Sequence, residues 1–462
     1  MGGGATVTTL HPAVGIALLV SIVLIFALPR RAVIIPVLLS IFLIPMGQVI
    51  VWGGMHFPVS RIILIAACLR ASVMFLESKS ESLAGGFNSV DKAFIVWGCC
   101  YAVFFVLQWN EMQAVINRAG FVVDGFGGYF LLRLLIRDDK AVNRTLAVFA
   151  VIAAVVAAEM VYEQFTLRNL FGMLGGTHSI PELRDGRIRS CGVFQHAILA
   201  GSFGATMLPL FLGLLSRKAW VTAIVGAIGA TVIVVTSSSS TPLLAYAAVL
   251  IGFLFWFLRT RMRLIRWAIL IVLIALQLSM KADVWWLISH VDLVGGSSYH
   301  RANLVDTFIK HFSDWWLIGT KDYDQWGWDM WDVSNQFVAM GLNAGLLGLV
   351  AFLIMISKAF GKLGIARRRL EKNRGNAWFM WCLGIALFGH VVAFFGTGYW
   401  DQTQIAWFAL FAMISATTAG ALNLPTKTLK PVARFRWPGW GTNTSINDLN
   451  RVSQPSCAQT DF

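Results

Sequence analysis

The sequence predicts an all-α membrane protein, a polytopic bundle of about 12 or 13 transmembrane helices. Only 13% of the 462 residues are charged and 57% are hydrophobic, whereas soluble globular domains carry roughly 25% charged residues. The apolar residues also gather into runs of about 20, the length that a helix needs to cross a hydrocarbon core about 30 Å thick. Composition and run length together exclude a water-soluble enzyme and a disordered chain.

Apolar runs of this length recur along most of the chain. The candidate spans lie near 12–28, 32–51, 57–76, 93–109, 116–136, 143–162, 194–215, 219–236, 242–258, 264–281, 336–357, 377–396 and 402–421. The run at 57–76 is the weakest, because Arg61 and Arg70 bracket a short apolar stretch. If the first runs form one re-entrant unit, the total falls by one.

The basic residues predict the orientation of these spans. Lys and Arg collect on the cytoplasmic side of membrane proteins, and most of the 37 basic residues fall in alternate connections if the N-terminus lies outside. The net charge of +14 is then a topology signal, and no nucleic-acid partner is expected. Two long connections, 163–193 and 282–335, become outer loops of a transmembrane domain at 1–422, and 423–462 becomes a disordered cytoplasmic tail.

Polar chemistry is expected at the outer face, because both long loops combine histidines, arginines, carboxylates and tryptophans. The sequence shows no His/Cys metal-ligand spacing and no Walker loop, so neither a metal nor a cofactor is expected. Ionisable residues inside spans are rare and costly, which makes them candidate functional sites. The clearest are Asp124, Arg133 and Glu159, although Glu159 lies close to the end of its span.

An arginine-rich segment closes the first outer loop and contains Arg187, Arg189 and His196. Guanidinium groups at the mouth of a helix bundle can bind a phosphate. The alternative is that these arginines anchor the chain at the lipid–water boundary, with their stems along the lipid.

A serine-rich turn follows at 236–240 and includes Ser239 and Ser240. Ser240 or Thr241 is expected to cap the next helix, with Pro242 in its first turn. The helix N-terminus would then offer N–H groups to a phosphate oxygen. An ordinary capped turn explains the same residues.

The second outer loop carries His300 and Arg301, followed by Asp306. Arg301 could face a diphosphate or form a structural pair with Asp306. Five tryptophans lie between residues 315 and 331, with aspartates among them. Indole rings can cover the apolar face of a sugar while carboxylates accept its hydroxyl hydrogens, and an interfacial aromatic belt is the alternative. The candidate residues of this segment are Trp326, Trp328, Asp332, Ser334 and Asn335.

These motifs, taken in order, make the chain resemble the O-antigen ligase and polysaccharide polymerase superfamily of bacterial inner membranes. The resemblance rests on Tyr129–Arg133, on Arg189–His196 before an apolar helix with Leu208-Pro209-Leu210, on the serine turn before Leu243-Leu244, on Arg301, on the stretch ending at Gly319, and on Ser334-Asn335 before Gly345–Gly348. It covers roughly 120–400, and the order of the motifs carries more weight than any one of them.

The resemblance implies a bundle of the C-type glycosyltransferase kind with a large periplasmic loop. It implies a metal-independent inverting transfer of glycan from undecaprenyl diphosphate, in exopolysaccharide, O-antigen or lipopolysaccharide assembly. In this picture Arg189 and Arg301 neutralise the diphosphate leaving group, with His300, Asp332 and Asn335 as further catalytic or binding candidates.

The chain departs from the family pattern at two positions. Ligases carry Ser-Arg where this chain has Ser239-Ser240, and His-Asn where it has Ser334-Asn335. Because Ser334 cannot act as a general base at neutral pH, that role would pass to Asp332, His300 or His196. These departures favour a polymerase over a ligase without separating the two. A flippase for lipid-linked sugars and a non-catalytic member of a polysaccharide export complex, with other assembly proteins as partners, remain the alternatives.

Overall fold

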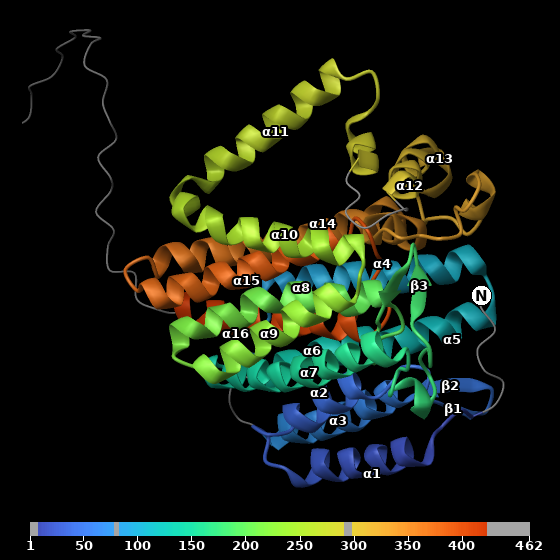
Figure 1. Ribbon diagram of the computed structural model, residues 1–462, viewed down its shortest axis with the longest axis vertical. Coiled ribbons are helices and arrows are strands. Elements are labelled where there is room, and N and C mark those ends of the chain that lie inside the picture. The colour runs from blue at the N-terminus through green and yellow to red at the C-terminus, as the bar shows by residue number, and fades with distance from the viewer. Residues whose placement is uncertain (1–7, 78–82, 291–297, 423–462) are drawn as a thin grey trace, which may run out of the picture. The chain divides into compact units, whose positions relative to one another are not determined.

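The computed structural model describes residues 8–77, 83–290 and 298–422, and these residues are almost entirely helical (Figure 1). The helices are α1 (Pro12–Ala27), α2 (Ile34–Leu43), α3 (Val59–Glu77), α4 (Ser89–Trp109), α5 (Met112–Phe121), α6 (Gly128–Leu135), α7 (Asp139–Thr166), α8 (Ala197–Gly213), α9 (Trp220–Thr236), α10 (Ser240–Leu254), α11 (Met262–Ser279), α12 (Ser298–Lys310), α13 (Phe312–Trp315), α14 (Gln336–Arg369), α15 (Arg374–Ala393) and α16 (Gln402–Leu422). Two antiparallel hairpins pair β1 (Val49–Trp52) with β2 (Met55–Pro58), and β3 (Glu182–Arg184) with β4 (Arg187–Arg189). The predicted tail at 423–462 lies outside the described residues.

The helices confirm the predicted class of a multi-pass, all-α membrane protein. Seven helical segments of the described chain are long and apolar enough to cross a membrane: Ser89–Trp109, Asp139–Thr166, Ala197–Arg217, Ser240–Ser279, Gln336–Arg369, Arg374–Ala393 and Gln402–Leu422. Shorter apolar helices lie at Pro12–Ala27, Ile34–Leu43 and Trp220–Thr236. A bilayer is therefore the environment in which this chain folds.

The segment Ser240–Ser279 contains two helices, as the two predicted spans in this region require. A 3₁₀ turn at Phe255–Arg261 separates α10 from α11, and Figure 1 shows the chain bending there. Arg259 and Arg261 lie in this turn. Helix α11 has no buried residue, and large apolar side chains cover it all round. Such a surface suits lipid and would not be stable in water.

The predicted second span, 32–51, is wrong in its length. Helix α2 has only 10 residues and is about 15 Å long, half of a hydrocarbon core. It ends just before Pro45, and the chain then turns into the β1–β2 hairpin. Gly53 and Gly54 form the hairpin turn with positive φ angles of 57° and 74°, a conformation that glycine adopts without strain. The apolar composition of this run hid the change from helix to strand.

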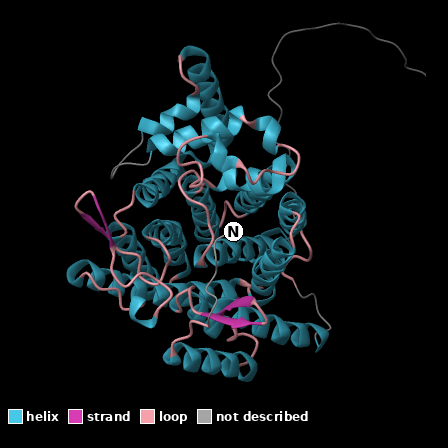
Figure 2. Cartoon of the chain, turned by 90° about the vertical axis from the view of Figure 1, so that its right-hand side faces the viewer, coloured by secondary structure: helices cyan, strands magenta, loops and turns pink. Residues whose placement is uncertain are grey.

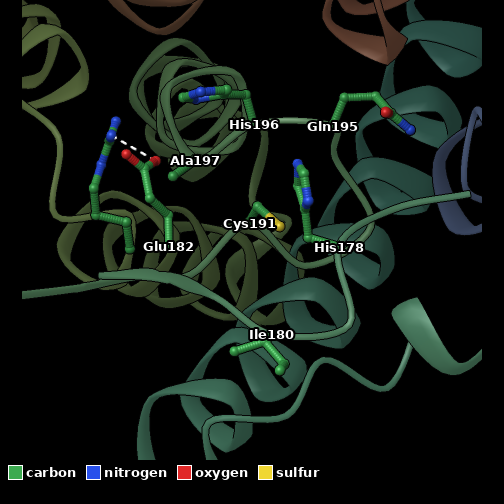
Figure 3. Close-up of a pocket in the computed structure, with 8 residues that line it drawn as sticks. His178, Ile180, Glu182, Cys191, Gln195, His196 and Ala197 are labelled. Carbon is green, nitrogen blue, oxygen red and sulfur yellow. Dashed lines mark hydrogen bonds and ion pairs between the residues drawn. The ribbon is translucent and has the colours of Figure 1, made fainter. Parts of the chain in front are cut away.

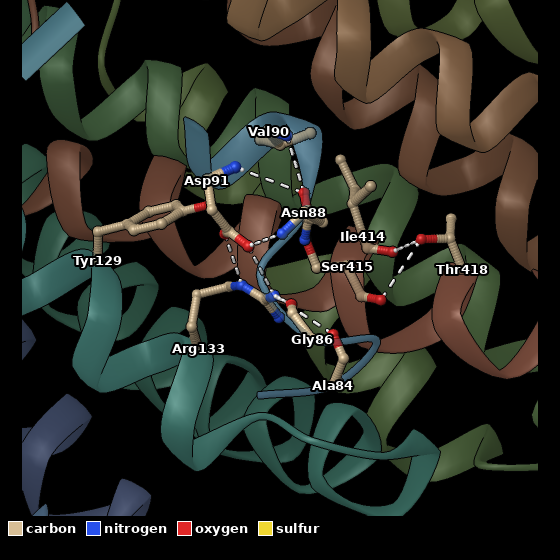
Figure 4. Close-up of polar contacts among 10 residues, drawn as sticks. All are labelled: Ala84, Gly86, Asn88, Val90, Asp91, Tyr129, Arg133, Ile414, Ser415 and Thr418. Carbon is tan, nitrogen blue, oxygen red and sulfur yellow. Dashed lines mark hydrogen bonds and ion pairs between the residues drawn. The ribbon is translucent and has the colours of Figure 1, made fainter. Parts of the chain in front are cut away.

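A buried ion pair joins α4 to α6 (Figure 4). Arg133 Nε lies 2.9 Å from Asp91 Oδ1, and neither side chain is exposed. The Tyr129 hydroxyl donates to the same oxygen at 2.6 Å. Asn88, which caps α4, donates to Ser415 Oγ on α16 at 3.3 Å. Arg133 was a candidate functional residue because burying a charge in lipid is energetically costly. In the structure the ion pair with Asp91 explains why Arg133 can be buried.

The other two ionisable candidates inside spans, Asp124 and Glu159, also make polar contacts. Asp124 forms an ion pair with Arg61 at 2.6 Å, in which both side chains are partly exposed. Glu159 accepts the backbone N–H of Leu170 at 3.0 Å, and Glu163, one turn later on α7, accepts the N–H of Gly192 at 3.0 Å. The two glutamates thus tie the α7–α8 connection to the end of α7.

Both long connections lie at one end of the bundle, which we call the loop end (Figure 1). Figure 2, which faces this end, shows both two-stranded hairpins there. Hydrogen bonds link connections that are distant in sequence: Ser190 donates its N–H to Thr236, and Gln336 to Phe394. The first of these bonds ties the first long loop to the end of α9, and the second ties the end of the second long loop to the end of α15.

Candidate functional site

A cavity of about 370 Å³ opens at the loop end, between the β3–β4 hairpin and the start of α8 (Figure 3). It is lined by His178, Ile180, Glu182, Arg189, Cys191, Gln195, His196 and Ala197. Two predicted site residues, Arg189 and His196, are thus part of one cavity. The lining combines a guanidinium, two imidazoles and a carboxylate, which are groups that recognise charged and hydroxylated ligands.

The β3–β4 hairpin positions Arg189. Asp185 and Gly186 form its turn with φ angles of 51° and 71°, and Asp-Gly is a preferred pair for a tight hairpin turn. The turn sets a register in which Glu182 lies opposite Arg189. The cavity is therefore lined by the last residue pair of this ladder.

Arg189 is buried and has two side-chain partners. Its Nη1 donates to Glu182 Oε2 at 2.7 Å, and its Nη2 donates to Ser239 Oγ at 3.3 Å. The side chain of Arg189 is only 5% exposed, whereas that of Glu182 is 48% exposed. A buried guanidinium at the mouth of an apolar bundle is a strong site for an anion, because water screens it little.

The serine-rich turn lies beside this arginine. Ser239 occupies the N-cap position of α10, and its hydroxyl contacts Arg189 without capping the helix. The predicted cap at Ser240 or Thr241 is wrong, because both residues already belong to the first turn of α10. Ser240 is buried at the start of this helix. The structure thus joins the arginine motif to the serine turn.

His196 occupies the N-cap position of α8, and its Nδ1 is buried with no hydrogen-bond partner in the described structure. Burial lowers the pKa of His196, and the nearby charge of Arg189 lowers it further. Glu182 and Asp332 act in the opposite direction.

His300 lies on α12 and faces two aspartates of the same loop. Its Nε2 is 2.9 Å from the backbone carbonyl of Asp332, and its Nδ1 is 3.8 Å from Asp329 Oδ2. A carbonyl oxygen can only accept, so Nε2 carries the hydrogen in this arrangement. Nδ1 is then the nitrogen that can take up a proton, and the Asp329 carboxylate would stabilise the resulting imidazolium.

Arg301 is buried on the same helix, 7% exposed. Asp306, its predicted structural partner, accepts from Lys310 Nζ at 2.6 Å and from Trp285 Nε1 at 3.0 Å. Burial tends to raise the pKa of Asp306, but the hydrogen bonds from Lys310 and Trp285 outweigh it and lower that pKa. Asp306 therefore stabilises the packing of α12.

Asn335 and Ser334 lie where the second loop enters α14. Asn335 caps this helix by accepting the N–H groups of Phe337 and Val338 at 2.9 and 3.2 Å. Ser334 Oγ is buried, and no partner for it is present in the described part of the chain. The geometry gives Asn335 a structural role that the sequence did not anticipate.

The remaining binding candidates differ in exposure. Trp326 stacks on His311 with ring centroids 4.6 Å apart, as part of the packing of the second loop. Trp328 is 91% exposed, so its ring is free to cover a sugar. Arg187 is exposed on β4, two residues before Arg189.

Sequence reasoning missed two carboxylates: Glu182, which lines the cavity, and Asp401, which is buried just before α16. Glu182 looked like an ordinary loop residue, although the Asp185-Gly186 signal already implies its pairing with Arg189. Asp401, just before α16, accepts the backbone N–H and the hydroxyl of Thr403 at 2.9 and 2.7 Å. Burial raises the pKa of Asp401 to about 6.

Among the residues that the structure describes, no group of three or more His, Cys, Asp or Glu side chains is placed to hold a metal ion. Cys191 is buried, and this burial, with the nearby Glu163 carboxylate, raises the pKa of its thiol to about 12. Its thiol is therefore protonated and a poor nucleophile. Comparison with known protein families and with curated proteins finds no match for this chain.

Proposed function

We propose that this chain is an inverting glycosyltransferase of a bacterial inner membrane. It transfers or polymerises glycan from undecaprenyl diphosphate at the periplasmic face, as its resemblance to O-antigen ligases and polymerases implies. The observation that supports this proposal most strongly is the buried Arg189 guanidinium, which lines a cavity at the loop end beside Ser239 and His196. A lipid-linked diphosphate can present its phosphates at this depth while its polyprenyl chain stays in the bilayer.

In the proposed reaction an acceptor hydroxyl attacks the anomeric carbon of the donor sugar. The bond from this carbon to the diphosphate oxygen breaks, its electron pair leaves with the diphosphate, and the configuration inverts. Arg189 stabilises the charge that develops on the leaving group, with Arg301 as the second proposed clamp. His300 Nδ1 accepts the hydroxyl proton, and Asp329 and Asp332 stabilise the imidazolium. Trp328 binds the apolar face of a sugar.

Substitution of Arg189 tests the proposal directly. Arg189→Ala should lower kcat for glycan transfer by about 100-fold to 1,000-fold, because one charge-stabilising donor is lost. Arg189→Lys should retain part of the activity, since lysine keeps the charge but not the paired donors. The assay is transfer from a lipid-linked donor in membranes that contain equal amounts of each variant. Arg168→Ala, an exposed arginine of the same loop, is the control.

Full transfer by Arg189→Ala would contradict the proposal. Substrate flux in liposomes without any change in glycan length would identify a flippase. A deletion strain separates the two proposed activities: accumulated single lipid-linked repeats indicate a polymerase, and finished polymer without an acceptor indicates a ligase.

A further inference from the structure

The anion position at Arg189 is already occupied by a carboxylate of the same chain. Glu182 Oε2 lies 2.7 Å from Arg189 Nη1, and Figure 3 shows the Glu182 side chain beside the other cavity residues. An incoming phosphate cannot form this charged hydrogen bond unless Glu182 releases it. The affinity of the cavity for any anion therefore depends on a competition with Glu182.

The exposure of the two partners makes this exchange asymmetric. Glu182 is half exposed, so its carboxylate can return to water at little loss. Arg189 is almost fully buried, so its guanidinium is costly to leave without an anion. An arriving phosphate group satisfies Arg189 at the moment Glu182 leaves. The pair can therefore exchange one anion for another without exposing an unpaired buried charge.

The hairpin permits this movement. Glu182 and Arg189 form the last pair of the β3–β4 ladder, and the next residue of β3, Leu183, is 68% exposed. Strand β4 is held from the bundle side, where Gln164 donates to the carbonyl of Ile188 at 3.0 Å. The Glu182 side chain can therefore rotate toward water while Arg189 stays in place.

We propose that Glu182 is a displaceable counter-ion that makes the cavity selective for anions of high charge density. This inference rests on the proposed function, in which a diphosphate binds Arg189. A diphosphate carries more negative charge than a carboxylate, so its attraction to Arg189 is stronger and it displaces Glu182. A monoanion such as acetate has the same charge as the Glu182 carboxylate and gains no such advantage. Glu182 is thus a specificity-determining residue of the donor site.

The test measures the binding of inorganic pyrophosphate and of acetate to the full chain in lipid nanodiscs. Glu182→Gln keeps the shape and a hydrogen-bond acceptor but removes the competing charge. It should bind pyrophosphate about 2-fold to 5-fold more tightly than the wild type, an increase typical of losing one partly exposed charge pair. The affinity for acetate should increase by a larger factor than the affinity for pyrophosphate, so that the ratio of the two affinities becomes smaller. Glu182→Asp keeps the competing carboxylate and should therefore keep the wild-type preference for pyrophosphate over acetate. Glu111→Gln, at an exposed glutamate outside the cavity, should change neither the pyrophosphate affinity nor the acetate affinity.

The outcomes separate this inference from the proposed function. If Arg189→Gln abolishes pyrophosphate binding while Glu182→Gln leaves it unchanged or weakens it, the counter-ion role is wrong and the donor site stands. If neither the wild type nor Glu182→Gln binds pyrophosphate in a way that depends on Arg189, both the counter-ion role and the proposed donor site are wrong. Tighter binding with an unchanged preference over acetate would also overturn the selectivity.

Discussion

Arg189 shows how one residue can make an apolar bundle receptive to an anion. A guanidinium is always protonated at physiological pH, and burial removes most of the water that would screen it. The chain gives it a hydroxyl from Ser239 and an exchangeable carboxylate from Glu182. This arrangement gives the Arg189 charge a partner before a ligand arrives, and the partner can leave when the ligand binds.

His196 should couple the binding of an anion to the uptake of a proton. Burial and Arg189 lower its pKa, while Glu182 and Asp332 partly oppose them and His178 adds to the lowering. Because the folded pKa lies below the unfolded value of about 6.5, His196 destabilises the folded chain as the pH falls through that value. A bound phosphate would favour the imidazolium and remove this penalty, so that binding strengthens at lower pH.

The expected result is a difference between two pH profiles. Pyrophosphate affinity, measured at pH 8, 7 and 6, should rise more steeply with falling pH in the wild type than in His196→Gln, by at most about tenfold per pH unit. The ligand's own protonation is the same for both proteins and cancels in the ratio. Parallel profiles would mean that His196 does not take up the linked proton.

The sequence allowed Arg189, His196 and Ser239 to be named, because polar side chains stand out where apolar helices begin. It could not show that Arg189 and Ser239 touch, since they lie 50 residues apart and meet only through the packing of α8, α9 and α10. Glu182 was missed because an exposed glutamate in a loop is the commonest surface feature. The Asp185-Gly186 turn fixes the strand register that places it opposite Arg189, and the sequence reasoning did not follow that signal.

At the scale of elements, the cavity depends on how the α7–α8 connection is held. Glu163, fully buried on α7, accepts the backbone N–H groups of Cys191 and Gly192 at 3.1 and 3.0 Å. Gly192 has a positive φ of 58° and lies within 3.1 Å of Glu159 and Met160 at the point where a Cβ would sit. The glycine at position 192 and the Glu163 carboxylate therefore both stabilise the turn between β4 and α8.

Removing the Glu163 carboxylate should loosen this connection. Glu163→Ala leaves two buried N–H groups without their acceptor, which should destabilise the fold by about 1–3 kcal/mol. Glu163→Gln keeps one acceptor oxygen and should lose less. Thermal unfolding in detergent, followed by tryptophan fluorescence, measures the change, with the exposed Glu111→Ala as control. Equal melting temperatures for Glu163→Ala and the wild type would show that the connection is held by other contacts.

Element prediction failed where apolar composition does not distinguish helix from strand. The run at 32–51 contains both the 10-residue α2 and the strand β1, and hydropathy alone merges them. The second long loop was recognised only as a break in the apolar pattern, and it contains α12 and α13 around a small core with Phe308 and Trp315. Its polar composition hid these helices, because their buried face is short.

At the scale of the whole molecule, one fully buried ion pair, Asp91–Arg133, joins two helices of the bundle, α4 and α6. Asp91 also could not be recognised from the sequence, because it precedes the apolar run at 93–109 and looks like a surface residue. In the structure its carboxylate accepts hydrogen bonds from the Arg133 guanidinium, the Tyr129 hydroxyl and the backbone N–H of Asn88. A buried carboxylate with this many donors joins the start of α4 to α6 and stabilises the fold only while its cation is present.

Removing the Arg133 cation alone should therefore destabilise the fold more than removing both charges of the pair. Arg133→Met leaves the Asp91 carboxylate buried without a cation and should destabilise the fold by about 3–5 kcal/mol. Asp91→Asn together with Arg133→Met replaces the pair by neutral groups of similar size, and this double variant should be more stable than Arg133→Met. The control is Arg61→Met, because the Arg61–Asp124 pair is partly exposed and should contribute only about 0–1 kcal/mol. Thermal unfolding of the full chain measures all three, and a double variant less stable than Arg133→Met would show that hydrogen bonding, not charge, makes Asp91 necessary.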